Sequence, residues 1–264
     1  MKIALISLNQ EWKKKSINFK KCLSIINSLK NEKIDCIIFP ELTLTGFCFE
    51  DSNLFENIKK SKTLNDFEKL SSKKNINIIF GSLISIDQKT YNTFCLSQPN
   101  KKTAIIYKKI NTFIPSKENL FISNGKDVDF FTLNKTNFLP SICFDLLFPL
   151  HYLSLSKFCQ ASICIANWPK SRISHWHTLL KARAIENQMY LIGVNRIGVD
   201  GNGLNYSESS EIYDPFGEKV KPNFIDDNVK IYDINFDNVK EARESFRSLL
   251  ISRNNTYLKK SSLF

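Results

Sequence analysis

The chain has 264 residues, a formal charge of +11 and 42% hydrophobic residues. This length and hydrophobic content exclude a disordered chain, so we expect one domain across residues 1–264, with a basic tail from about residue 252. The lysines form short scattered groups without interleaved aromatics, which argues against a nucleic-acid-binding surface. No apolar stretch is long enough to span a bilayer, and no signal peptide precedes the first apolar run. We therefore expect a cytoplasmic protein that binds neither nucleic acid nor membrane.

The number of cysteines is odd, and none forms a Cys-x-x-Cys pair. These features are evidence against a disulfide framework and against a thiolate zinc site, so we expect free thiols in a reducing compartment. The seven cysteines are Cys22, Cys36, Cys48, Cys95, Cys143, Cys159 and Cys164.

Apolar runs and helical periodicities alternate through the first half of the chain. Residues 2–8 predict a buried strand, and apolar positions every three to four residues predict a helix over 16–30, with Ser16 as a candidate cap. A continuous apolar run over 34–39, ended by Pro40, predicts a strand buried on both faces. The elements expected next are a helix over 64–70, strands over 76–86 and 91–96 with a turn at 87–89, and a strand over 103–107.

The second half begins with a long aperiodic segment, residues 113–129, of a length that usually carries function in a compact domain. The alternation of strands and helices then resumes and predicts an α/β fold. The expected elements are a strand up to Cys143, a helix over 150–158, a strand over 161–166, a helix over 175–187, strands over 190–194, 211–218 and 229–234, and a helix over 239–246.

Three side chains with chemical potential follow predicted strands directly: Glu41, Lys109 and Cys143. At adjacent strand ends the carboxylate could take the thiol proton, the ammonium and a backbone N–H could hold an oxyanion, and the thiol could attack a carbonyl or nitrile carbon. The alternatives are a solvent-facing glutamate, one lysine among many and a small buried cysteine. Glu118, in the long loop, is a fourth candidate.

Other chemistries find less support in the sequence. A Cys–His hydrolase would have to pair Cys143 with His151, His175 or His177. The histidines form no zinc-binding pattern, and neither a dinucleotide fingerprint nor a phosphate-binding loop is present. We therefore expect no metal and no nucleotide cofactor.

Three motifs, in order, resemble those of the nitrilase superfamily of carbon–nitrogen hydrolases. Residues 40–47 resemble its glutamate motif, residues 107–113 its Tyr-x-Lys-x-His-x-Phe motif, and residues 143–149 its Cys-Tyr-Asp-x-Arg-Phe-Pro motif. The resemblance covers almost the whole chain. Within the family it is nearest to the omega-amidases, on the strength of residues 139–140, 167–176, 182–188 and 195–203.

The resemblance implies a four-layer αββα sandwich, no metal or organic cofactor, and usually a homodimer paired through helices. It makes Glu41 the general base, Lys109 the oxyanion stabiliser and Cys143 the nucleophile, with the Phe144 N–H as a second oxyanion donor. Glu118 matches the family's second glutamate less closely.

The implied reaction is hydrolysis of the terminal amide of a dicarboxylic acid monoamide, such as 2-oxoglutaramate or 2-oxosuccinamate, by water through a thioester on the cysteine. Asn167 and Trp168 are expected to bind substrate or support the site. Arg172 is a candidate clamp for the distal carboxylate, because a guanidinium binds carboxylates in a fork; a surface or helix-capping arginine is the alternative.

The chain departs from the family pattern at three positions. Leu147 replaces the arginine of the cysteine motif, Asn111 replaces the histidine of the lysine motif, and Glu208 stands where a glycine is expected. These differences bear on substrate choice and rate more than on reaction class. The alternatives are therefore another branch of the superfamily, such as a carbamoyl-amide hydrolase or a nitrilase, and a catalytically weak scaffold that binds a partner.

Overall fold

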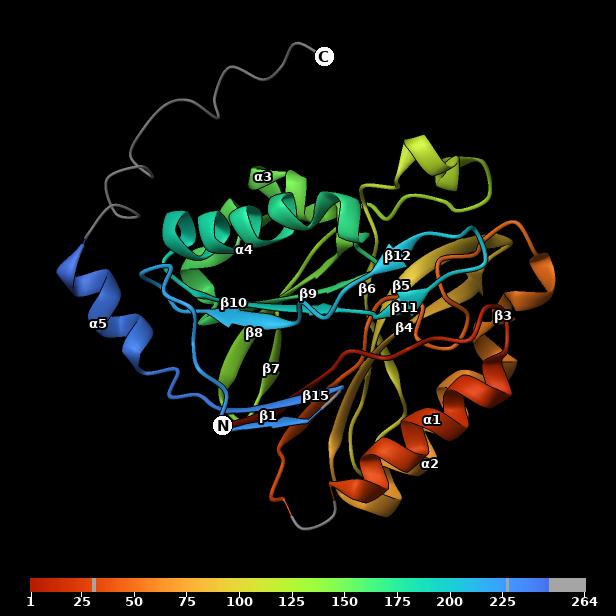
Figure 1. The fold of residues 1–264 in the computed structure, drawn as a ribbon, viewed down its shortest axis with the longest axis horizontal. Helices are drawn as coiled ribbons and strands as arrows, with labels where there is room; N and C mark the ends of the chain where they lie inside the picture. Colours follow the sequence, from red (N-terminus) through yellow and green to blue (C-terminus); the bar gives the residue numbers. More distant parts are fainter. Residues whose placement is uncertain (30–31, 227, 247–264) are drawn as a thin grey trace.

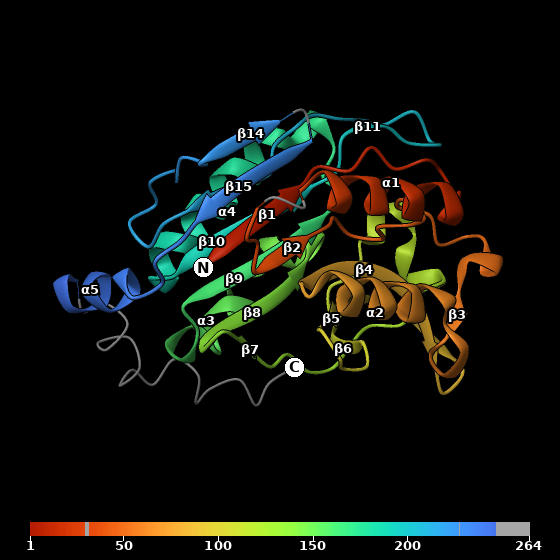
Figure 2. The ribbon, with the colours of Figure 1, turned by 90° about the horizontal axis from the view of Figure 1, so that it is seen from below.

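The computed structural model shows two β-sheets packed face to face between two pairs of helices (Figure 1; Figure 2). It describes residues 1–29, 32–226 and 228–246. Helices α1 (Lys15–Ser28) and α2 (Lys62–Lys74) cover the outer face of the first sheet. Helices α3 (Pro149–Leu153) and α4 (Ile173–Asn187) cover the outer face of the second. This arrangement confirms the predicted αββα sandwich.

The first sheet has the strand order β14-β15-β1-β2-β4-β5-β6, with the short β3 paired to β4. Its centre is parallel, β1 to β2 to β4, and its two sides are antiparallel. The strands are β1 (Lys2–Ile6), β2 (Cys36–Ile38), β3 (Glu56–Asn57), β4 (Asn77–Ile86), β5 (Lys89–Ser97), β6 (Ala104–Lys108), β14 (Phe224–Asp226) and β15 (Val229–Asp233).

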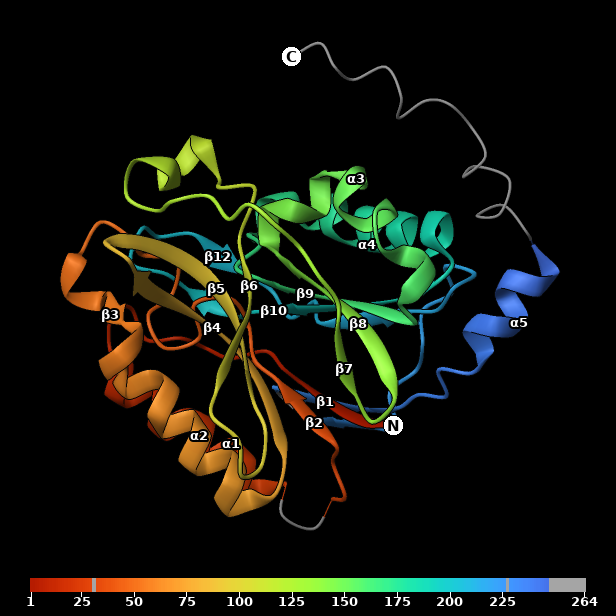
Figure 3. The ribbon, with the colours of Figure 1, turned by 180° about the vertical axis from the view of Figure 1, so that it is seen from behind.

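The second sheet has the order β13-β10-β9-β8-β7, again with a parallel centre, β8 to β9 to β10. Figure 3 shows β8 and β7 from behind, facing β5 and β6 of the first sheet. Its strands are β7 (Phe131–Leu133), β8 (Thr136–Ile142), β9 (Ala161–Ala166), β10 (Tyr190–Asn195) and β13 (Glu211–Tyr213), and a small ribbon pairs β11 (Gly198–Val199) with β12 (Asn205–Tyr206).

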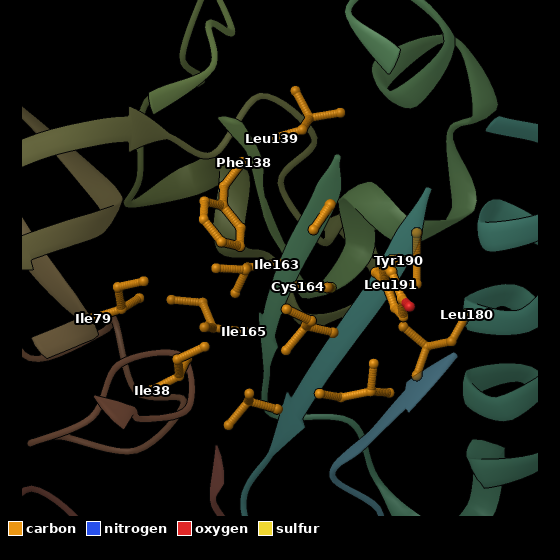
Figure 4. Packing of buried hydrophobic residues seen from close by; sticks show 14 of the residues in the cluster. Ile38, Ile79, Phe138, Leu139, Ile163, Cys164, Ile165, Leu180, Tyr190 and Leu191 are labelled. Carbon is orange, nitrogen blue, oxygen red and sulfur yellow. The ribbon is translucent and has the colours of Figure 1, made fainter. Parts of the chain in front are cut away.

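The apolar runs of the central strands are continuous because both faces of each strand are buried. In β2, Ile38 faces the second sheet while Ile37 faces the helices α1 and α2. Figure 4 shows Ile38 and Ile79 of the first sheet against Phe138 and Ile163 of the second. Successive strand residues point to opposite faces, so each apolar run fills two layers of core at once.

Several predicted boundaries differ from the observed ones. Helix α1 begins at Lys15 without a side-chain cap, so Ser16 is not its cap, and residue 30 lies outside the described residues. The helix predicted over 150–158 is the short α3 followed by a separate 3₁₀ turn, Ser156–Phe158. The predicted tail from residue 252 also lies outside the described part of the chain.

A last helix, α5 (Asn238–Ser245), begins and ends one residue before the predicted range of 239–246, and its Ala242 carbonyl accepts a hydrogen bond from Gln188 at the C-terminal end of α4. The long loop over 113–129 contains two 3₁₀ turns, Ile114–Ser116 and Glu118–Leu120. None of the helices in residues 1–29, 32–226 and 228–246 combines the length and apolar character needed to cross a membrane.

Candidate functional site

Glu41 lies directly after β2 and Pro40, in a loop that crosses over β4. The loop approaches Gly81 of β4 so closely that an added Cβ there would lie 2.4 Å from the Leu42 nitrogen and 2.9 Å from the Glu41 Cα. Glycine is therefore required for this contact, because any other side chain would push the loop away. The Glu41 side chain is completely buried.

Lys109 follows β6 and carries its ammonium group into the same buried region. Its Nζ lies 3.1 Å from Glu41 Oε1 and 2.9 Å from Glu118 Oε2, and all three side chains are 0% exposed. Glu118, which the sequence offered as a weaker candidate, also accepts the Phe113 N–H at 2.6 Å. One ammonium therefore lies between two carboxylates, as buried charges require partners.

Cys143 is at the corner between β8 and the 3₁₀ turn Cys143–Leu147. Its φ of +48° is unusual for a residue with a side chain and represents local backbone strain. The corner is held by Asp145, whose Oδ2 accepts the Ile142 N–H at 2.9 Å. The thiol donates to the Asn167 carbonyl oxygen, with Sγ 3.9 Å from it.

Asn167, which follows β9, connects the cysteine to the glutamate. Its backbone N–H donates to Glu41 Oε2 at 2.9 Å and its side-chain amide donates to the Glu41 carbonyl at 2.7 Å. The same residue accepts the Cys143 thiol through its carbonyl. Asn167 therefore fixes the loop of Glu41 relative to the cysteine corner. From the sequence alone, Asn167 was expected either to bind substrate or to support the site, and these contacts are of the supporting kind.

Trp168 and Arg172 lie beside the cysteine corner. Trp168 is buried, and its Nε1 donates to the Arg172 carbonyl at 2.8 Å. The Arg172 guanidinium is half-buried and lies 5.1 Å from the centre of the Phe113 ring, which in turn contacts the Phe144 ring. Arg172 forms no ion pair with a carboxylate within the described residues, so its charge is available to a ligand.

Phe144 is the second residue of the 3₁₀ turn that begins at Cys143. Backbone N–H groups in the first turn of a helix have no partner inside the helix. The Phe144 N–H is therefore free of the turn's own hydrogen bonds and immediately follows the thiol.

Asn92 of β5 was not anticipated as part of the site. Its side-chain nitrogen donates to Glu41 Oε1 at 2.8 Å and to Glu118 Oε1 at 3.0 Å. Its backbone carbonyl accepts the backbone N–H of Lys109 at 2.9 Å. The one sequence signal is a polar residue inside the apolar strand that ends at Leu96, which by itself predicts no role.

The departures from the family motifs have individual structural consequences. Asp145 accepts hydrogen bonds from the Tyr107 hydroxyl at 2.9 Å and from both the backbone and the side chain of Asn111. Leu147, in place of the arginine, is 42% exposed. Glu208 accepts a hydrogen bond from the hydroxyl of Ser7, just after β1, and pairs with Lys230. Asp145 is fully bonded without the arginine, so the corner does not depend on it.

Burial and charge set the protonation of the site. Burial raises the pKa of the Cys143 thiol well above its ordinary value, and the negative charge of Glu41 adds to this while Lys109 opposes it. Burial alone would lower the pKa of Lys109, but the carboxylates of Glu118 and Glu41 outweigh burial and raise it. At neutral pH the site therefore holds a neutral thiol and a charged ammonium, and a nucleophilic sulfur requires a base.

None of the three histidines is paired with Cys143 by any contact among the described residues. His151 Nε2 lies 2.9 Å from the Pro140 carbonyl, and His177 pairs with Glu211. His175 is exposed. The structure therefore gives no support to a Cys–His pair at Cys143.

Comparisons with known proteins identify the family of the chain. The family model for carbon–nitrogen hydrolases matches residues 2–244. The omega-amidase YafV of Yersinia enterocolitica is 32% identical over 219 residues, covering 83% of each chain. A 2-oxoglutaramate amidase of Bacillus subtilis is 26% identical over 245 residues, covering 92% of this chain and 94% of the relative.

Solved structures show the same fold. A CN-hydrolase superfamily protein from Xanthomonas campestris superposes with a TM-score of 0.88 at 24% identity, covering 95% of this chain and 96% of the other. A carbon–nitrogen hydrolase from Helicobacter pylori superposes with a TM-score of 0.89 at 15% identity, covering 100% and 98%. The chain therefore belongs to the carbon–nitrogen hydrolase family and is an amidase of the nitrilase superfamily.

Proposed function

We propose that this amidase hydrolyses the terminal amide of a small dicarboxylic acid monoamide, of the 2-oxoglutaramate or 2-oxosuccinamate type, and releases ammonia. The observation that carries the proposal is the arrangement of a cysteine at a strained corner, a buried Glu41–Lys109 pair, and a guanidinium without a carboxylate partner in the described residues. Relatives named omega-amidase and 2-oxoglutaramate amidase support the substrate class.

In the proposed acylation step, Glu41 takes the thiol proton of Cys143 and the sulfur attacks the amide carbon. The Lys109 ammonium and the Phe144 N–H stabilise the oxygen as it gains negative charge. Glu41 then gives the proton to the departing nitrogen, the C–N bond breaks, and ammonia leaves. A thioester remains on Cys143.

In the proposed deacylation step, Glu41 takes a proton from water as the water oxygen attacks the thioester carbon. The tetrahedral oxyanion collapses, the C–S bond breaks, and the proton returns to sulfur. The products are the dicarboxylic acid and the free thiol. Glu118 keeps the ammonium of Lys109 charged and in place through both steps, from 2.9 Å.

The test is ammonia release by the purified protein from 2-oxoglutaramate, 2-oxosuccinamate, N-carbamoyl amino acids and simple nitriles. We expect turnover of the first two and none by the Cys143→Ala variant. Turnover confined to the carbamoyl compounds or nitriles would instead favour another branch of the superfamily. Equal inactivity of both proteins on every compound would favour a scaffold role.

Arg172 is proposed to bind the distal carboxylate of the substrate through its forked guanidinium. Arg172→Met should then raise KM for 2-oxoglutaramate about ten- to a hundredfold, since a hydrogen bond to a charged group contributes about 1.5–3 kcal/mol. Lys170→Met is the matched control, because Lys170 is an exposed cation in the same 3₁₀ turn. Equal KM values for the two variants would contradict the clamp.

We also propose a homodimer that pairs through the face of α3. Large apolar side chains are exposed there, with Leu150 at 65% and Leu153 at 38%. Burying such a surface favours association. Light scattering should show a dimer that Leu150→Lys converts to monomer, whereas Ile225→Lys, at an equally exposed apolar residue of β14, should leave it intact.

A further inference from the structure

We propose that Asn92 is a positioning residue of the amide-hydrolysis site, which holds Glu41 and Glu118 as two separate carboxylates on either side of Lys109. The proposal rests on the catalytic roles given above for Glu41 and Lys109. Asn92 lies in the middle of β5 and is 0% exposed. It contacts all three charged residues: the two glutamates through its side chain, and Lys109 through its backbone carbonyl.

The electrostatic problem at this site is an excess of negative charge. Two buried carboxylates share a single ammonium, with Lys109 Nζ 3.1 Å from Glu41 Oε1 and 2.9 Å from Glu118 Oε2. Two carboxylates in one buried site repel each other. This repulsion would push the base out of the position that the reaction needs.

Asn92 reduces this problem without adding charge. A side-chain amide has two N–H donors, and here one acceptor is Glu41 Oε1 at 2.8 Å and the other is Glu118 Oε1 at 3.0 Å. Each bond places an N–H dipole against the negative charge of the carboxylate that accepts it, and so offsets part of the repulsion between the two carboxylates. The opposite orientation of the amide would place its oxygen against both carboxylates, so the donor assignment follows from the neighbours.

The geometry also fixes the distance between the base and the ammonium. Asn92 lies opposite Leu83 of β4 in the antiparallel register, while Lys108, next to Lys109, lies opposite Thr93. The Asn92 carbonyl accepts the Lys109 N–H at 2.9 Å. The same strand residue therefore sets the backbone of the lysine and the side chains of both glutamates.

The test follows the pH dependence of Cys143 alkylation by iodoacetamide, in which sulfur displaces iodide and the thiol proton leaves through the base. The titratable groups that interact with one another at this site are Glu41, Lys109, Glu118, Cys143, Cys164 and Tyr206. Peptide mass mapping reports Cys143 separately from the other cysteines. The readout needs no substrate, so it remains valid even if the proposed dicarboxylate monoamide is wrong.

We expect Asn92→Ala to move the acidic midpoint of the alkylation profile upward by about one pH unit and to lower the rate at pH 6 about tenfold. Asn92→Asp, of the same shape, should move the midpoint further because it adds a third carboxylate. The amide kcat/KM of each variant, once a substrate is known, should follow the same shift.

The matched control is Asn187→Ala. Asn187 is also fully buried and its side-chain amide also donates to two oxygens, but these belong to Arg183 and Glu186 on α4. Its alkylation midpoint should equal that of the wild type. If Asn92→Ala and Asn92→Asp changed the melting temperature or the rate without moving the midpoint, Asn92 would have a structural role alone and the proposal would be wrong.

Discussion

Asn111 donates two hydrogen bonds to the Asp145 carboxylate, from its backbone N–H at 3.0 Å and from its side-chain amide at 2.9 Å. Asp145 in turn holds the Ile142 N–H at the entrance to the cysteine corner. Asn111 stands where the family motif has a histidine, and it connects the lysine segment to the cysteine segment. The corner of Cys143 is therefore held in part by a residue, Asn111, that differs from the one in the family motif.

Replacing Asn111 with alanine should destabilise the corner. The change removes one hydrogen bond to a fully buried carboxylate, and we expect a loss of about 1–2 kcal/mol in the free energy of unfolding, together with lower activity. Urea denaturation measures the first effect and ammonia release the second.

Two control variants test whether the loss of stability in Asn111→Ala comes from the hydrogen bond to Asp145. Lys62→Met removes the exposed bond to Asp66, and Leu147→Arg restores the family arginine at a 42% exposed position. Each should change stability by no more than about 0.5 kcal/mol, as is usual for surface substitutions. A large gain from Leu147→Arg would show that Asp145 still lacks a partner.

The central strands could be predicted from the sequence because each is marked by a continuous apolar run of neighbouring residues. The apolar run before Pro40 has both faces buried, and Glu41, Lys109 and Cys143 occur in ordered motifs that place them after strands. The structure brings these three segments together, as predicted. Their catalytic roles remain predictions.

Asn92 could not be predicted, because its position depends on pairings between distant strands. Its side chain meets Glu41, 51 residues away, after β4 and β5 have paired. The short edge strand β14 likewise exists through its pairing with β15 and has no periodicity of its own. Ser16 was predicted as a cap from residue type, but α1 begins one residue earlier without any side-chain cap.

Gly81→Ala should displace the loop of Glu41. The added Cβ would lie 2.4 Å from the Leu42 nitrogen, a distance at which the backbone must move. We expect a loss of about 1–3 kcal/mol in the free energy of unfolding, as for other overpacked sites, and a fall in kcat of at least tenfold. Denaturation and initial-rate measurements test the two parts.

Gly203→Ala is the control for glycine replacement itself. Gly203 has a φ of +78° but nothing within 4 Å of an added Cβ, so its variant carries strain without a clash. It should lose about 1 kcal/mol of stability and keep its kcat. If both variants kept full activity, the close approach at Gly81 would not position the base.

Lys109→Met should destabilise the protein more at neutral than at acidic pH. At pH 7.5 it leaves two buried carboxylates without their cation, and we expect a cost of about 3–5 kcal/mol. At pH 5 a proton can replace the lost charge, so the difference from the wild type should shrink. Urea denaturation at the two pH values measures it.

Lys230→Met provides the comparison. Lys230 pairs with Glu208, whose side chain is 36% exposed, so solvent can screen the carboxylate that remains. Lys230→Met should lower the free energy of unfolding by about 1 kcal/mol or less, and this loss should change little between pH 5 and pH 7.5. Equal costs for the two variants would mean that the site at Lys109 is open to water.

The buried thiols should make the protein sensitive to alkali. Burial raises the pKa of Cys95, Cys159 and Cys164 from the ordinary value of 9.0 to about 12, and raises those of Cys22 and Cys36 as well. Above pH 9 the unfolded chain loses these protons while the folded chain keeps them. Stability therefore falls as pH rises from 9, by up to about 1.4 kcal/mol per thiol and pH unit.

Urea denaturation between pH 8 and pH 10 measures this slope, to which tyrosines whose pKa burial raises also contribute as the pH approaches 10. Cys36→Ala should make the slope shallower by up to about 1.4 kcal/mol per pH unit, because it removes one group that loses a proton on unfolding. Ile37→Val, which removes a methyl group from the neighbouring buried residue of β2, should lower stability without changing the slope. A slope that Cys36→Ala leaves unchanged would show that the thiol ionises equally in the folded and unfolded chains, against the burial observed for β2.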